Sequence, residues 1–137
     1  MASGVRIIAR IAALLLVAAF GFFGYFKSFA PHAVLEQHHA WTTALPDLLG
    51  RAIGLSELLA AALLLIFGVI LLDRGRVAAG VALYAIGNQV CAALVHIARG
   101  ESAALPQNAV LAGLALMIIL AARTHRTKPE ETMGRQF

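Results

Sequence analysis

The stretch Leu48–Leu72, LLGRAIGLSELLAAALLLIFGVILL, decides the fold. It follows Pro46, contains a single carboxylate, Glu57, and is continuously apolar after that residue except for Gly68. A helix needs about 20 mostly apolar residues to cross a bilayer, because hydrocarbon cannot satisfy exposed backbone groups. The stretch therefore predicts a membrane-spanning helix that begins close to Pro46.

Three further stretches meet the same requirement, at about 7–26, 77–98 and 103–122. Of the 137 residues, 61% are hydrophobic and only 13% are charged, whereas a soluble domain has about 45–50% apolar and about 25% charged residues. This composition excludes a soluble globular domain. We expect an all-α integral membrane protein, a bundle of four transmembrane helices. Residues 1–122 would form one membrane domain with an outer loop over 28–46, followed by a polar cytoplasmic tail over 123–137.

The basic residues predict the direction of threading. Eight of the eleven fall on one side of the expected spans: Arg6, Arg10, Arg74, Arg76, Arg123, Arg126, Lys128 and Arg135. Because cytoplasmic loops are enriched in Lys and Arg, both termini are predicted to be cytoplasmic. The charge thus indicates a multi-pass protein of the cell (inner) membrane, with the lipid bilayer and not nucleic acid as its partner. The alternative for the first span is a cleaved signal peptide ending at Ser28-Phe29-Ala30. The length of the apolar run and its aromatic end argue against cleavage.

Polar residues of three spans fall at a similar depth. Ionisable groups inside a membrane are costly, so they usually face the bundle interior and pair with one another. Spaced three or four residues apart, Tyr84, Asn88, Ala92, His96 and Arg99 share one helical face. The threading brings this face close to the end of the first span and the start of the second. We therefore predict one pocket, opening outward, lined by Lys27, Glu57, Tyr84, Asn88, His96 and Arg99.

This polar set is open to three interpretations. Glu57 can pair with Lys27 or Arg99 and simply hold the helices together. The set can also bind a small ligand. As a third alternative, Glu57 and His96 can act as acid and base, the candidate catalytic pair of an isomerase.

The outer loop contains the only other cluster of potential ligands. His32 and Glu36 are four residues apart, so a short helix would place them on one face with His39 nearby. Histidine and carboxylate suit zinc, copper or iron, but the established metal motifs are absent, and we predict no metal site. The alternative is an interfacial segment in which Trp41 anchors at headgroup depth.

Several motifs make the chain resemble the DoxX-like family of small bacterial membrane proteins. They are Gly24-Tyr25-Phe26-Lys27, Trp41 with Leu45-Pro46, Arg51-Ala52-Ile53-Gly54-Leu55-Ser56-Glu57-Leu58-Leu59-Ala60-Ala61, His96 and Pro106. The resemblance covers nearly all of residues 6–122 and implies a four-helix membrane bundle, in agreement with the hydropathy.

The resemblance also implies functions that the residues alone do not reach. Relatives include a small subunit of thiosulfate:quinone oxidoreductase, so it suggests an oxidoreductase component linked to quinone or sulfur compounds. Quinone is the cofactor that the resemblance implies. The sequence encodes no haem, iron–sulfur or flavin motif of its own, so an electron-transfer role would need a partner subunit. Candidate partners are a membrane or redox subunit and a second copy of the chain. From the residues, we expect an accessory subunit or a small-ligand-binding bundle.

Overall fold

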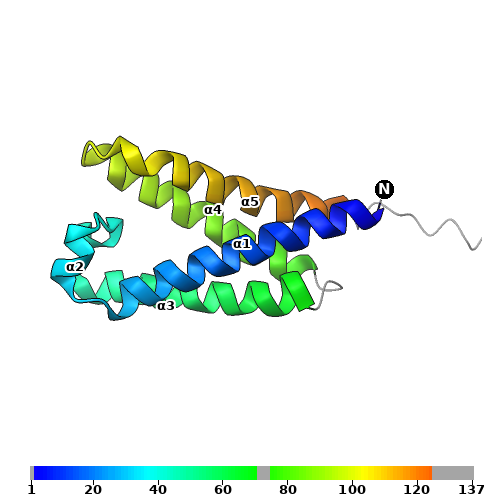
Figure 1. Ribbon diagram of the computed structural model, residues 1–137, viewed down its shortest axis with the longest axis horizontal. Helices are drawn as coiled ribbons and strands as arrows, with labels where there is room; N and C mark the ends of the chain where they lie inside the picture. The colour runs from blue at the N-terminus through cyan, green and yellow to red at the C-terminus, as the bar shows by residue number, and fades with distance from the viewer. Residues whose placement is uncertain (1, 71–74, 125–137) are drawn as a thin grey trace, which may run out of the picture.

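The computed structural model describes residues 2–70 and 75–124, which contain helices and connecting segments but no strand (Figure 1). Four helical stretches are long and apolar enough to cross a membrane: Ser3–Phe29, Asp47–Ile70, Gly75–Ala98 and Ser102–Thr124. They confirm the predicted all-α class with four spans. The predicted end of the second span, Leu72, and all of the predicted tail except Arg123 and Thr124 lie outside the described residues. Arg123 and Thr124 still belong to the last helix.

The four spans form two pairs. Helix α1 (Ala2–Phe29) packs along α3 (Asp47–Leu63), which the π-helical segment η2 (Leu64–Ile70) continues, and α4 (Gly75–Ala98) packs along α5 (Leu105–Thr124). The start of α1 and the end of α5 lie at the same end of the bundle, and the two pairs separate towards the other end (Figure 1). We call this other end the α2 end, because it carries α2 (His32–Gln37) and the short helices η1 (Trp41–Ala44) and η4 (Ser102–Ala104).

Small side chains fill the centre of the bundle, while many large ones face outward. The buried core is rich in alanine, including Ala13, Ala82 and Ala115, which have no exposed surface. Large apolar residues such as Leu59 and Leu83 are more than half exposed. This distribution suits helices in lipid, where close backbone packing holds the bundle together and the outer surface must be apolar.

Two glycines bring α1 and α3 into backbone contact. A Cβ atom added to Gly24 would lie 2.8 Å from the carbonyl oxygen of Gly54, and one added to Gly54 would lie 2.8 Å from the backbone nitrogen of Ser28. Neither position has room for a side chain. The crossing point therefore depends on glycine at both positions.

The segment between α1 and α3 (residues 30–46), called the outer segment after the loop predicted over 28–46, folds back onto the bundle. Leu35 in α2 is 3% exposed and Trp41 is 7% exposed. The ring of Trp41 packs inside the protein against Lys27, whose Nζ lies 5.4 Å from the ring centroid, while the headgroup depth predicted for Trp41 stays a prediction. A cation–π contact of this kind stabilises an aromatic ring inside the protein.

We predict that Gly24→Ala destabilises the protein by about 1–3 kcal/mol, because the added methyl group forces α1 and α3 apart. Unfolding in mixed detergent micelles, followed by the fluorescence of Trp41, measures this loss. Gly21→Ala is the matched control one turn away on the same helix, since a Cβ there meets nothing within 4 Å. Equal stability of the two variants would contradict the proposed role of the crossing.

Candidate functional site

A buried carboxylate joins three helices. Glu57 on α3 is 1% exposed, and its Oε1 accepts hydrogen bonds from Lys27 Nζ on α1 at 2.6 Å and from Asn88 Nδ2 on α4 at 2.7 Å. Lys27 and Asn88 are each 8% exposed. The charge of Glu57 is thus compensated by a buried cation, as a carboxylate in a membrane requires.

The helix crossing positions this ion pair. Lys27 follows Gly24 by three residues and Glu57 follows Gly54 by three residues, so both side chains start next to the point of backbone contact. Arg51 fixes the end of α1, since its Nη1 donates to the carbonyl oxygens of Lys27, Ser28 and Ala30. The last carbonyl groups of a helix have no partner within the helix, and a cation there is stabilising.

A cavity of about 760 Å³ lies next to the ion pair and extends to the α2 end. Its apolar wall is largely aromatic and includes Phe20, Phe22, Phe23, Phe26 and Trp41. The main polar lining side chains are Lys27, Glu57, Gln89, His96, Glu101, Gln107 and Asn108. An apolar cavity with a few polar groups is the usual form of a small-molecule site.

Three of the six residues predicted to line the pocket do so, namely Lys27, Glu57 and His96, and three do not. Asn88 reaches the carboxylate of Glu57 but not the cavity wall, where its neighbour Gln89 lies instead. Tyr84 is 37% exposed, and its hydroxyl group is 2.5 Å from that of Ser56. The polar stripe of α4 therefore does not face the cavity as a whole. It is divided between the ion pair, the cavity and the outer surface of the bundle.

Arg99, the third residue outside the cavity wall, belongs to a second cluster centred on Glu101. The carboxylate of Glu101 lies 2.7 Å from Nδ1 of His96, 3.0 Å from Nε of Arg99 and 3.1 Å from Nδ1 of His39. Arg99 also donates to Thr43 Oγ1 at 3.2 Å. This cluster ties the outer segment to the turn between α4 and α5.

Its partners stabilise the ionised form of Glu101. The pKa of this carboxyl group lies below its ordinary value, mainly because of the hydrogen bond with His96. Partial burial acts in the opposite direction, and the charge of Arg99 lowers the pKa further. The sequence prediction missed Glu101, although a lone carboxylate two residues after an arginine is a recognisable signal.

Two buried polar atoms have no hydrogen-bond partner within the described part of the chain, Glu57 Oε2 and Asn108 Nδ2. Both side chains line the cavity. One atom is an acceptor and the other a donor. A buried polar atom without a partner costs about 1–3 kcal/mol, so this arrangement calls for an explanation.

The candidate metal ligands of the outer loop do not come together. Nδ1 of His32 lies 3.5 Å from Glu36 Oε1 within α2, as the spacing suggested. His39 instead turns towards Glu101. Residues 2–70 and 75–124 contain no group of three potential metal ligands that could hold an ion.

The model of the DoxX-like family matches residues 11–119, which include most of all four spans and both clusters. The chain belongs to the DoxX-like family. The resemblance noted in the sequence is thereby confirmed. Comparisons of this DoxX-like protein with curated proteins and with solved structures gave no significant match.

We predict that Lys27→Met destabilises this DoxX-like protein by about 3–5 kcal/mol, because it leaves the carboxylate of Glu57 buried without a cation. The double variant Lys27→Met/Glu57→Gln should recover part of that loss, since the charge is then gone as well. Unfolding in mixed micelles compares the two. A double variant less stable than Lys27→Met would show that the pair does not act as a unit.

We also predict a stability difference between the wild type and Glu101→Gln that depends on pH. Because the folded state lowers the pKa of Glu101, the ionised cluster stabilises the fold at pH values above the ordinary value of 4.5. That contribution is lost as the pH falls below 4.5 through the folded-state pKa. Melting temperatures in detergent should therefore differ at neutral pH and converge in acid, and a difference that grows in acid would contradict the assignment.

Proposed function

We propose that this DoxX-like protein binds a small, mostly apolar molecule in the cavity between its two helix pairs. The observation that carries the proposal is that Glu57 and Asn108 both line one cavity, and that each has a buried polar atom, Oε2 and Nδ2, without a partner among the described residues. A ligand with one polar group supplies the missing partners. The aromatic wall then contacts the rest of the ligand.

In this proposal, the ion pair prepares the site. Lys27 and Asn88 both bind Oε1 of Glu57, so the carboxylate is fixed and its charge is balanced before a ligand arrives. Only the second oxygen is left to accept a hydrogen bond. A group fixed in this way loses little conformational freedom when the ligand binds.

We place the α2 end on the outer side of the cell membrane, following the distribution of basic residues in the sequence. The cavity then lies in the outer half of the bilayer. This position suits a ligand that arrives from outside the cell or from the outer leaflet. An accessory subunit that presents such a ligand to a membrane partner would need the same architecture.

Acid–base catalysis by Glu57 and His96 is the second candidate, because both side chains line the cavity. Each is held through one polar atom, Glu57 by Lys27 and His96 by Glu101, which leaves Oε2 and Nε2 for a substrate. Catalysis predicts that a bound molecule is recovered in altered form, whereas binding alone returns it unchanged. Mass spectrometry of the recovered molecule distinguishes the two.

The chain contains one tryptophan, and Trp41 lines the cavity, so its fluorescence reports on this site alone. We predict saturable quenching by 4-bromophenol, whose hydroxyl group both donates and accepts. Asn108→Leu should weaken that binding about tenfold through the lost hydrogen bond. Bromobenzene, which has no hydroxyl group, should bind the wild type and the variant equally.

Asn88→Leu is the matched control for the fold. It removes the hydrogen bond to Glu57 and should lower the stability of the ligand-free protein by about 1–3 kcal/mol. Asn108→Leu removes an amide nitrogen that has no partner in residues 2–70 and 75–124, so it should leave the stability unchanged or raise it. Equal affinity of the wild type and Asn108→Leu for 4-bromophenol, or quenching that never saturates, would overturn the proposed function.

A further inference from the structure

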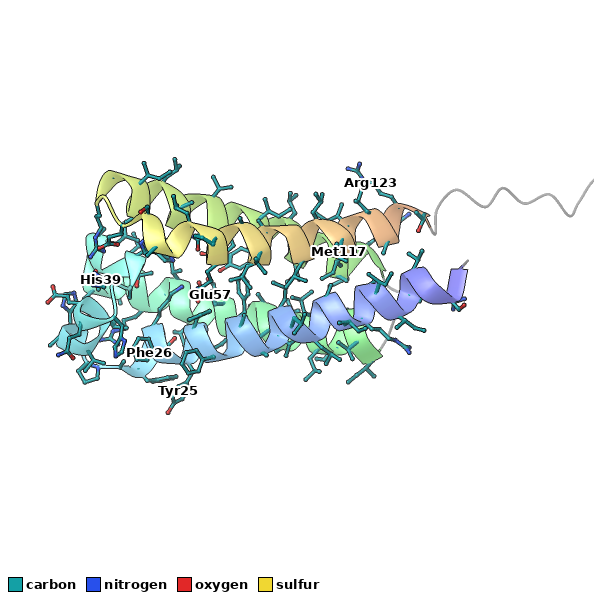
Figure 2. All side chains as sticks on the ribbon, turned by 45° about the horizontal axis from the view of Figure 1, so that its top comes forward. Tyr25, Phe26, His39, Glu57, Met117 and Arg123 are labelled. Carbon is teal, nitrogen blue, oxygen red and sulfur yellow. The ribbon has the colours of Figure 1, made fainter. Side chains whose placement is uncertain are left out.

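The exposed members of the cavity lining show where the cavity opens. The exposed members are Phe22 on α1, which is 65% exposed, His38, His39, Gly100, Ser102, Ala103 on η4 and Gln107 on α5. Glu57, Asn108 and Leu111 belong to the same lining but are buried. The cavity therefore opens at the α2 end, and Phe22 and Gln107 extend the opening along the side of the bundle between α1 and α5. Figure 2 looks onto this face, where Glu57 lies between the ribbons of the two helices.

The opening extends well below the α2 end. Phe22 lies seven residues before the end of α1, which corresponds to about 10 Å along the helix axis. The helices around it carry large exposed apolar side chains, among them Leu15 on α1 and Val110 on α5. In a membrane protein such a surface faces the acyl chains. The side opening thus faces lipid over much of its length.

The outer segment covers part of the cavity at the α2 end, where His38 and His39 are exposed members of the lining. His39 is bound to Glu101 and Arg99 to Thr43, so the segment is tied to the turn between α4 and α5. An aromatic edge connects this cover to the side opening. The rings of Phe22 and Phe26 are parallel with centroids 6.3 Å apart, and the ring of His38 meets Phe26 edge-on at 5.5 Å.

We propose that the ligand is an amphiphile with a hydroxyl head and an alkyl tail, taken from the bilayer through the side opening, with its tail remaining in lipid. This inference rests on the proposed function. A hydroxyl group offers both a donor for a carboxylate oxygen such as Glu57 Oε2 and an acceptor for an amide nitrogen such as Asn108 Nδ2. An ionised carboxylate head has no donor for Glu57, and an ammonium head offers no acceptor to Asn108.

A series of 4-alkylphenols, from ethyl to dodecyl, tests the side opening. The protein is placed in phosphatidylcholine nanodiscs, and each alkylphenol competes with 4-bromophenol for the cavity. The concentration of the alkylphenol is expressed as a mole fraction of the lipid. A tail that stays in hydrocarbon before and after binding contributes little binding free energy. The affinity should therefore vary by no more than about threefold along the series. A sharp loss of affinity beyond a certain tail length would show a closed cavity and overturn this inference.

Ala103→Phe places a larger side chain on the rim of the side opening. Phenylalanine is chosen rather than tryptophan so that the fluorescence still comes from Trp41 alone. The substitution should weaken binding of the dodecyl compound at least about tenfold more than binding of 4-bromophenol, because only the tail must pass the narrowed opening. Leu94→Phe, on a 61% exposed position of α4 away from the cavity lining, is the control and should change neither. If Ala103→Phe weakens binding of both compounds equally, the proposal that the tail passes through the side opening is overturned.

The outcomes separate this inference from the proposed function. Absence of any saturable 4-bromophenol binding overturns both. Binding of 4-bromophenol together with exclusion of the longer phenols overturns only the side opening, and the cavity then remains a site for small molecules.

Discussion

The buried ion pair between Lys27 and Glu57 is the interaction on which the rest of the structure depends. A carboxylate in the middle of an apolar bundle is tolerated only if a cation and further donors reach it. That requirement brings α1 within backbone contact of α3, which only glycine at positions 24 and 54 allows. It also brings α4 close enough for Asn88 to donate. One charge thus explains the packing of three helices at the same depth.

The clusters around Glu57 and Glu101 have different structural roles, which follow from their positions in the bundle. Glu57 gathers partners from within the bundle, whereas Glu101 gathers His39, His96 and Arg99 where the chain leaves it. The first cluster sets the separation of the helices, and the second holds the outer segment over the cavity. Since His96 lines the cavity and binds Glu101, it connects the site with its cover.

Much of this arrangement follows from the sequence, but the rotation of the helices does not. Hydropathy predicts the four spans, and their alternating direction places Lys27 and Glu57 at one depth. The helical period shows that Tyr84, Asn88 and His96 share a stripe, but a stripe about 100° wide can face several neighbours at once. Tertiary packing then turns Asn88 to Glu57 and Tyr84 to Ser56. The contacts of Trp41 and Glu101 lie in connections, where no periodicity indicates a partner.

Asn108 separates a structural interpretation of the polar residues from a functional one. Helix pairing accounts for Lys27, Glu57 and Asn88, because each satisfies another. It does not account for Asn108, whose amide nitrogen is buried without a partner among the described residues. Asn108, next to Gln107 and directly before a long apolar run of α5, is the signal by which the sequence could have revealed this position. In the proposed function, a ligand in the cavity supplies the partners that the amide nitrogen of Asn108 and Oε2 of Glu57 lack among the described residues.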